Sequence, residues 1–229
     1  MVTIRTLIAT VALLLAGPAA AQDLIYLTHP EGQKLFGASQ HRASYFAVAS
    51  YLETEHVQTF CGPASIAAVM NSLDVERPKP RRLYPYGLFT QDEVFTPENQ
   101  RVKSYDAVER AGLTLEEARR FMENLGVRAV THHGDSFDAA WLRQAIMSAL
   151  GDPGRRMIVN YWRQSVGQEG GGHFSPVGAY DEASDRVLVL DVAKYKYPPA
   201  WVPLVALHEA MKTIDATSRQ ARGLVVITR

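Results

Sequence analysis

The spacing of apolar residues changes near Pro153, and this change constrains the fold more than any other feature of the sequence. Before it, apolar residues recur every three to four positions, which is typical of amphipathic helices. One such helix begins with a capping box formed by Thr114 and Glu117 and ends at Gly126, and a second spans residues 136–150. Beyond Pro153 the apolar residues form short runs typical of strands: residues 157–162, 174–180, 186–190 and 224–227.

These patterns predict an α+β fold in which a helical part is followed by an antiparallel sheet. Short polar turns such as residues 182–185 favour antiparallel pairing. Residues 74–102 contain four prolines and are predicted to form a long loop. The helix over residues 136–150 is expected to turn these side chains inward and to end at Gly151: Trp141, Ala145, Ile146 and Ala149.

Residues 1–21 have the layout of a secretory signal peptide. Arg5 precedes an apolar run over residues 7–15, and three alanines end the segment before Gln22. The run is too short to span a bilayer, which takes roughly 20 residues. We therefore expect an exported, periplasmic protein whose mature part, residues 22–229, is one domain without a membrane anchor.

The charges of the chain balance, with 24 basic and 24 acidic residues. A nucleic-acid-binding protein or a protein that binds an anionic membrane surface usually carries an excess of basic residues. The composition therefore gives no support to either class of partner, and we expect neither.

The chain has one cysteine, Cys61, so an internal disulfide is excluded. Apolar residues recur at helical spacing after it and Pro63 lies in the expected first turn, so Cys61 is predicted to begin a helix. The free N–H groups and the dipole of a helix N-terminus favour an anion and lower the pKa of a thiol placed there. One interpretation is a nucleophilic thiolate, and the other is a small buried side chain without a chemical role.

His173 follows three glycines at the start of one predicted strand, and Asp191 comes directly after the next strand. In an antiparallel hairpin both lie at the same end, where cross-strand neighbours on one face are about 5 Å apart. A carboxylate beside an imidazole fixes its tautomer, and the other ring nitrogen can accept a proton from a thiol. Cys61 would complete a Cys-His-Asp triad, but spacing alone does not bring it near His173.

Three blocks of sequence, in this order along the chain, resemble the catalytic domain of phytochelatin synthases. The likeness extends from about residue 35 to the C-terminus and includes residues 89–92 (FTQD) of the predicted loop. The three blocks are residues 59–65 (TFCGPAS), 172–181 (GHFSPVGAYD) and 191–204 (DVAKYKYPPAWVPL).

The resemblance implies a papain-like cysteine peptidase fold and a catalytic triad of Cys61, His173 and Asp191. It further implies attack of the thiolate on the Cys-Gly bond of glutathione, release of glycine and a γ-glutamylcysteinyl thioester on the enzyme. Water or a second glutathione then takes the acyl group, giving γ-glutamylcysteine or phytochelatin. The short bacterial members, which this chain most resembles, favour hydrolysis over synthesis and suggest a homodimer.

Further positions match residues with which the family holds its substrate. Asp215 corresponds to the partner of the α-amino group and Arg222 to the partner of the α-carboxylate. A carboxylate can pair with an ammonium, and a guanidinium can hold a carboxylate through two parallel hydrogen bonds. Lys194 and Lys196 match basic positions and are further candidates for substrate binding, although the family often has arginine in place of Lys194.

The chain departs from the family at Glu55, six residues before the nucleophile, where the family usually has a glutamine whose amide stabilises the oxyanion. An ionised carboxylate cannot donate a hydrogen bond, and loss of one oxyanion donor typically costs about 100- to 1,000-fold in rate. Three alternatives stay open: a protonated Glu55 donates, Gln58 replaces it, or the backbone N–H of Cys61 serves alone.

The sequence has no metal-ligand spacing, and His132 with His133 is interpreted as a surface pair. We expect no resident metal or cofactor, and heavy-metal ions such as Cd, Zn and Cu would enter as glutathione thiolate complexes. Two other functions compete with the one implied. One is a papain-like peptidase that removes double-glycine leader peptides, against which Asp215 and Arg222 argue. The other is a glutathione-binding module that keeps the binding pocket but has lost catalytic turnover because of Glu55.

Overall fold

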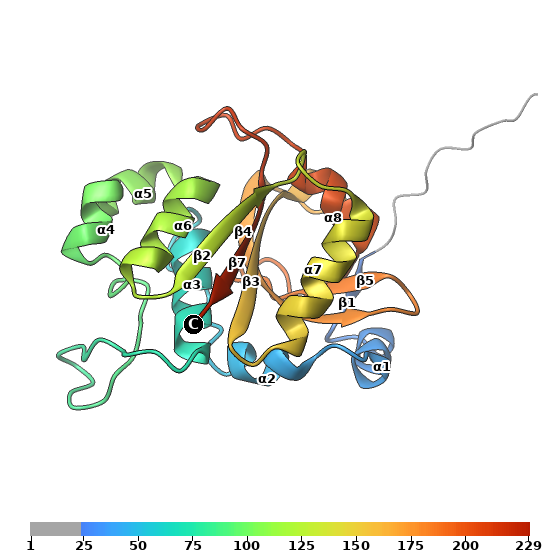
Figure 1. Cartoon of the computed structure of the whole chain (residues 1–229), viewed down its shortest axis with the longest axis horizontal. Coiled ribbons are helices and arrows are strands. Elements are labelled where there is room, and N and C mark those ends of the chain that lie inside the picture. Colours follow the sequence, from blue (N-terminus) through green and yellow to red (C-terminus); the bar gives the residue numbers. More distant parts are fainter. Residues whose placement is uncertain (1–23) are drawn as a thin grey trace, which may run out of the picture.

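The computed structural model describes residues 24–229, so the predicted signal peptide lies outside the described part of the chain (Figure 1). Within that part, seven strands form one antiparallel sheet in the order β1-β6-β5-β4-β3-β7-β2. The strands are β1 (Ile25–Tyr26), β2 (Arg128–His133), β3 (Arg155–Trp162), β4 (Gly172–Asp181), β5 (Arg186–Val189), β6 (Ala200–Pro203) and β7 (Gly223–Thr228).

Helices cover both faces of this sheet. α3 and α6 pack on one face, and α7 and α8 pack on the other (Figure 1). None of the helices in residues 24–229 has the length and apolar character needed to cross a membrane. The helices are α1 (Pro30–Ala38), α2 (Ala43–Ala49), α3 (Cys61–Ser72), α4 (Pro97–Val102), α5 (Tyr105–Ala111), α6 (Leu115–Asn124), α7 (Ala139–Gly151), α8 (Leu204–Met211) and the short 3-10 helix η1 (Arg163–Val166).

Strand β3 shows how the two layers of helices arise from the sequence. Successive side chains of a strand point to opposite faces of its sheet. Ile158 therefore packs in the core beneath α3 and α6, while Met157 and Val159 pack in the core beneath α7 and α8. A strand buried on both faces has a continuous apolar run rather than an alternating pattern. β3 has such a run at residues 157–159.

The α+β class, the antiparallel sheet, the four predicted strands and the two predicted helices are confirmed. Thr114 and Glu117 form the capping box at the start of α6, and Gly126, with φ of 94°, follows the end of this helix. The helices and strands are less segregated than predicted, because β2 precedes α7 and α8 separates β6 from β7. β2 was missed because this edge strand lacks a buried apolar run.

Two smaller predictions are wrong. Trp141 is 37% exposed and contacts the rings of His132 and Phe137 instead of turning inward. Residues 97–102 form α4 instead of the end of a loop, because Thr96 accepts a hydrogen bond from the backbone N–H of Asn99 and a proline stands in the first turn.

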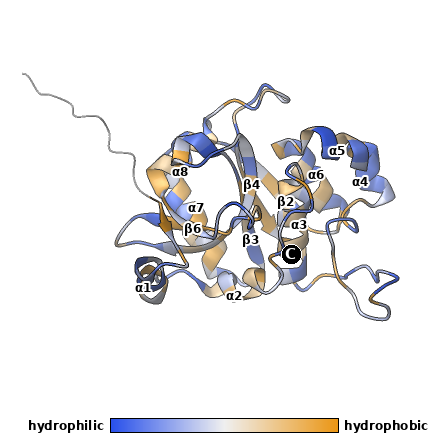
Figure 2. Ribbon diagram, turned by 180° about the vertical axis from the view of Figure 1, so that it is seen from behind, coloured by the Kyte–Doolittle hydropathy of each residue, from blue (hydrophilic) through white to orange (hydrophobic). Residues whose placement is uncertain are grey.

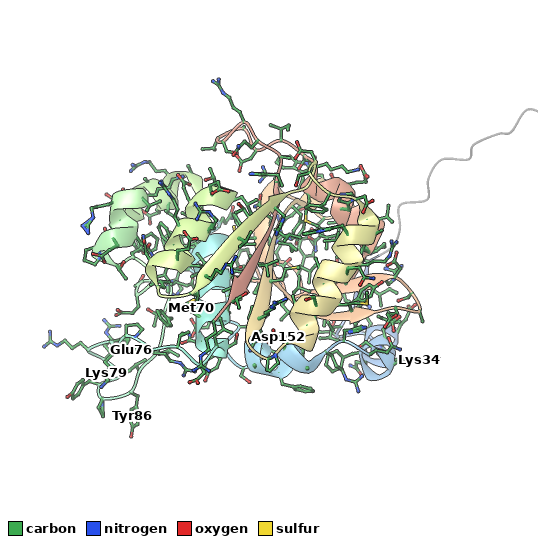
Figure 3. The ribbon with its side chains drawn as sticks, in the orientation of Figure 1. Lys34, Met70, Glu76, Lys79, Tyr86 and Asp152 are labelled. Atoms are coloured by element: carbon green, nitrogen blue, oxygen red, sulfur yellow. The ribbon has the colours of Figure 1, made fainter. Side chains whose placement is uncertain are left out.

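The loop between α3 and α4 projects from the body of the protein, and its Glu76, Lys79 and Tyr86 lie far from the sheet (Figure 3). Hydrophilic residues cover the nearby α4 and α5 (Figure 2). The loop returns to the core at Phe89, whose backbone N–H and C=O bind the side chain of Asn71 at 2.9 and 2.7 Å. This anchor places the end of the loop beside the C-terminal end of α3.

Candidate active site

Cys61 is the first residue of α3, as predicted, and its side chain is buried. The preceding Phe60 is fully buried and packs against Phe95, which fixes the start of the helix. Gly62 allows the Leu113 side chain to pack closely against the start of the helix, since a Cβ at residue 62 would lie 2.9 Å from it. Apolar packing thus holds the thiol at a helix N-terminus, beside strand β4.

His173 in β4 and Asp191 beyond β5 meet at one end of their hairpin, and both are buried. Nε2 of His173 lies 3.0 Å from Oδ1 of Asp191, and the backbone N–H of Ala193 donates to the same oxygen at 2.8 Å. The Cys61 sulfur, a His173 ring nitrogen and a Glu55 carboxylate oxygen lie within 4.8 Å of one another. The structure therefore brings the predicted triad together. Because Nε2 faces Asp191, Nδ1 is left for the thiol.

Arg163, at the start of η1, belongs to this site and was missed by the sequence analysis. Its guanidinium makes two hydrogen bonds of 2.8 Å to the carboxylate of Asp191 and a third of 2.6 Å to Gln168. It also lies 5.3 Å from the centre of the Tyr197 ring. The sequence offered one signal, an arginine directly after the predicted strand 157–162.

The carboxyl group of Asp191 is held in its ionised form. Burial alone would raise its pKa, but the hydrogen bond and charge of His173, followed by those of Arg163, hold the pKa well below its usual range. Asp191 can therefore orient the imidazole and stabilise the imidazolium without taking a proton itself. Because the folded pKa is depressed, the contribution of this group to stability is present above its unfolded pKa near 3.8 and is lost at lower pH.

Burial raises the pKa of the Cys61 thiol and lowers the pKa of the His173 imidazole. A negative charge on Glu55 raises the thiol pKa further, whereas the backbone hydrogen bonds of Phe174 and Gly62 lower it. The expectation of a lowered thiol pKa is thus wrong, because burial outweighs the N–H groups at the helix start. The proton rests on sulfur, and His173 is positioned to take it when the thiol attacks.

A cavity of about 230 Å³, here called the Asp215 cavity, lies beside the thiol and is lined by Cys61, Asp215 and Arg222 among others. Nη1 of Arg222 lies 3.5 Å from Oδ2 of Asp215, and both residues are buried. Asn160 accepts a hydrogen bond of 3.2 Å from the same nitrogen, and the guanidinium lies 5.3 Å from the Trp162 ring centre. Both predicted recognition residues therefore line the same cavity as the nucleophile.

A second cavity, of about 280 Å³ and here called the Glu55 cavity, contains Glu55, His173 and Lys196 in its walls. Gln58, whose side chain is exposed, lines both cavities. Lys194 lines neither of them. Its ammonium donates to the backbone carbonyl of residue 52 at 3.1 Å and borders a separate cavity, so its predicted role in substrate binding is not supported.

Glu55 is buried, and its two carboxyl oxygens differ in their hydrogen bonding. Oε1 accepts a hydrogen bond of 2.6 Å from the Tyr195 hydroxyl, and Oε2 has no partner within residues 24–229. Burial raises the pKa of Glu55 to about 7, although the hydrogen bond from Tyr195 and the charge of Arg163 act to lower it. Glu55 therefore titrates near neutral pH, where an ordinary glutamate is ionised.

Within the described chain, Glu55, Cys61 and His173 are the one group of three side chains placed closely enough to hold a metal ion. Zinc accepts such a set of sulfur, nitrogen and carboxylate ligands. The catalytic geometry accounts for the same cluster, and the absence of a resident metal stays a prediction. His132 and His133 lie apart from it on the partly buried strand β2.

The sequence matches the family model of phytochelatin synthase over residues 18–224. The chain belongs to this family. It is 30% identical over 203 residues to "Glutathione gamma-glutamylcysteinyltransferase 3" of Lotus japonicus, which covers 87% of this chain and 41% of the relative. Identity is 33% over 184 residues with "Glutathione gamma-glutamylcysteinyltransferase" of Schizosaccharomyces pombe, covering 80% of this chain and 43% of the relative. The chain thus spans about two fifths of the length of these relatives.

The papain-like arrangement implied by the sequence is present in this phytochelatin synthase family member. A cysteine begins a buried helix that packs on an antiparallel sheet, strand β4 of this sheet supplies the histidine, and the segment directly after β5 supplies the aspartate. A crystal structure of "a double glycine motif protease from AMS/PCAT transporter in complex with the leader peptide" is similar over 77% of this chain and 89% of that chain. Its TM-score is 0.42 and its sequence identity is 14%.

Replacement of Arg163 by Met is expected to destabilise the protein strongly, because it leaves the buried carboxylate of Asp191 without its guanidinium. Removing one partner of a buried pair costs about 3–5 kcal/mol. The free energy of unfolding in urea at pH 7 should fall by about this amount. The difference from wild type should shrink toward acidic pH, because the Asp191 carboxyl of the variant, without its guanidinium, takes up a proton at a higher pH than the carboxyl of wild type.

Arg143→Met is the matched control for this measurement. Arg143 also binds a carboxylate, that of Asp185, but both side chains are 35% exposed. Such pairs contribute about 0–1 kcal/mol. Equal losses of stability in the two arginine variants would contradict the role assigned to Arg163.

Proposed function

We propose that this protein transfers the γ-glutamylcysteinyl group of glutathione through a thioester on Cys61, mainly to water, so that glutathione is converted to γ-glutamylcysteine and glycine. Phytochelatin synthesis, with a second glutathione as acceptor, is the proposed minor reaction. One observation carries the proposal: Cys61, with His173 beside it, lines the same cavity as the buried pair of Asp215 and Arg222. The printed names of the relatives support glutathione as the substrate.

The Asp215 cavity suits the γ-glutamyl end of a peptide. That end has an ammonium and a carboxylate on one carbon atom, so a matching site needs an acid and a base close together. Asp215 and Arg222 offer these charges 3.5 Å apart. The Asp215 carboxylate can pair with the ammonium, and the guanidinium can hold the carboxylate. A leader peptide cut at an internal α-peptide bond presents no such zwitterion, so this pair favours a γ-glutamyl substrate.

The triad supplies the covalent steps of the proposed reaction. Nδ1 of His173 takes the proton of the Cys61 thiol as the sulfur attacks the carbonyl carbon of the Cys-Gly bond. The C–N bond then breaks, and the imidazolium gives its proton to the departing amine of glycine. Water next loses a proton to His173 and attacks the thioester, which releases γ-glutamylcysteine and restores the thiol. Asp191 stays ionised throughout.

The Glu55 cavity is suited to the glycine end of the substrate. Lys196 lines it, and its ammonium donates to the backbone carbonyl of residue 169 at 3.1 Å. An ammonium has three donors, so two remain for the carboxylate of glycine. When glycine leaves, water can enter this polar cavity and reach the thioester, which is the physical reason for placing hydrolysis first.

We further propose that Cd, Zn or Cu ions reach the site as thiolate complexes of glutathione and that the protein works after export to the periplasm. A metal carried by the substrate requires no site on the protein. Formation of a homodimer is part of the same proposal. It rests on the likeness of the sequence to short bacterial members of the family.

Replacement of Gly172 by Ala is expected to weaken substrate binding without unfolding the protein. A Cβ at this position would lie 2.1 Å from Nη1 of Arg222, so the guanidinium must move out of place. Hydrogen bonds to charged groups contribute about 1.5–3 kcal/mol, so the KM for glutathione should rise about tenfold or more. In the control Gly37→Ala, at an exposed position of α1 outside both cavities, the new Cβ would meet no atom within 4 Å. The same KM in both variants would argue against Arg222 as the carboxylate partner.

The proposed function is tested by mass spectrometry of glutathione incubated with the mature protein, with and without cadmium, and with Cys61→Ser as the control. Wild type should release glycine and γ-glutamylcysteine, and Cys61→Ser should release neither, because the nucleophile is lost. Longer γ-glutamylcysteine oligomers would show that synthesis competes with hydrolysis. Intact glutathione in every sample would refute the proposed activity on glutathione. The glutathione-binding module and the leader peptidase would then be the remaining alternatives.

A further inference from the structure

The free oxygen of Glu55 requires an explanation that the triad does not give. Glu55 is 4% exposed, Tyr195 satisfies Oε1, and Oε2 is buried without a partner among the described residues. Buried polar atoms are nearly always hydrogen-bonded, and an ionised carboxylate with a bare oxygen is costly. The cost falls if Oε2 carries a proton, and it disappears if a ligand oxygen accepts that proton in a hydrogen bond.

The backbone around Glu55 is held so firmly that the side chain has a defined direction. Its N–H donates to the carbonyl of Val192 at 2.9 Å. The fully buried amide of Gln91 accepts from the N–H of His56 and donates to the carbonyl of Thr54, each at 2.9 Å, and so clamps the residues on both sides. Positioning of this kind is what an oxyanion donor requires, because the donor must be in place before the charge develops.

The position of Glu55 is also that of an oxyanion donor. A carboxylate oxygen of Glu55 lies within 4.8 Å of both the Cys61 sulfur and a His173 ring nitrogen. When the sulfur bonds to a carbonyl carbon, the oxygen of that carbonyl lies next to the sulfur and beside the backbone N–H groups at the start of α3. The free Oε2 can then complete the hydrogen bonding of this oxygen.

We propose that Glu55 acts as a neutral carboxylic acid whose Oε2–H donates a hydrogen bond to the oxyanion, while Tyr195 holds Oε1 as the acceptor. The proton stays on Glu55, so no bond is made or broken there, and the hydrogen bond strengthens as negative charge develops on the substrate oxygen. Glutamine would present the same geometry, with its carbonyl toward Tyr195 and its NH₂ toward the substrate. The inference rests on the proposed function and deepens it.

Ionised and polar groups from four elements face Glu55, and they decide when it loses its proton. Tyr195, Lys196 and Asp191 belong to the segment after β5, Arg163 to η1, Cys61 to α3 and His173 to β4. Burial favours the neutral form, while the Tyr195 hydrogen bond and the positive charges of Arg163 and Lys196 favour the ionised form. Ionisation removes the donor and places a negative charge beside the thiol, so both effects slow the reaction at higher pH.

The test compares the pH dependence of kcat/KM for glycine release between pH 5.5 and 9 in wild type and in Glu55→Gln. Wild type should lose about tenfold per pH unit once Glu55 ionises, and this fall should be absent in Glu55→Gln, because the amide keeps its donor. At pH 9 the variant should exceed wild type by about 100-fold. Glu53→Gln, which removes an exposed carboxylate two residues away, should keep the wild-type profile.

A second variant distinguishes this role from a purely structural one. The hydrogen bond from Tyr195 lowers the pKa of Glu55, so Tyr195→Phe should move the fall in rate to higher pH. A structural role would lower the rate without moving the profile. If wild type is active and its pH profile has the same shape as that of Glu55→Gln, the role of Glu55 is overturned and the proposed function stands. Absence of glycine release by wild type at every pH would overturn the proposed function, and this role with it.

Discussion

The buried carboxylate of Asp191 is the centre on which the site depends. A buried charge must be paired and hydrogen-bonded, and Asp191 meets this requirement through Arg163, His173 and the N–H of Ala193. These partners come from different elements, so one carboxylate ties the end of β3, the start of β4 and the segment after β5 together. The packing of α3 on β4 then brings Cys61 to the same place.

The two carboxyl groups of the site differ in protonation because their partners differ. Asp191 binds a guanidinium and an imidazole, which hold its pKa well below the usual range. Glu55 receives one neutral hydrogen bond, from Tyr195, and burial raises its pKa to about 7. The same functional group is thus a permanent anion at one position and an acid that titrates near neutral pH at the other. Enzymes commonly divide two carboxyl groups between two roles in this way.

Residues carried by a local pattern could be predicted from the sequence, and residues that act through long-range packing could not. Cys61 was recognisable from the helical spacing behind it, and His173 with Asp191 from the hairpin between them. Arg163 follows a predicted strand and Gln91 lies in a block shared with the family, but neither position indicates which residue the side chain contacts. Gln91 acts on residues 54 and 56, more than thirty positions away, and only the folded chain shows that its amide clamps them.

Lys194 and Lys196 show the same limit on a smaller scale. Both are basic and lie two residues apart, and the resemblance to the family implies the same role for both. In the structure they belong to a turn, where the regular alternation of a strand does not apply, and their ammonium groups reach different carbonyls, at residues 52 and 169. Tertiary contacts set the direction of a side chain within an irregular segment, so the sequence pattern and spacing do not determine it.

The separation of the two cavities has a consequence for the choice of acceptor. The Asp215 cavity holds its charges in a buried ion pair, so it is suited to keep the γ-glutamyl group bound through both steps of the proposed reaction. In the proposed reaction, the Glu55 cavity exchanges glycine for the acceptor while the thioester persists. The triad treats water and an amine alike, because it removes a proton from either one. Under the proposed function, the balance between hydrolysis and synthesis therefore depends on how the walls of the Glu55 cavity, Lys196 and Gln58 among them, hold a second glutathione against water.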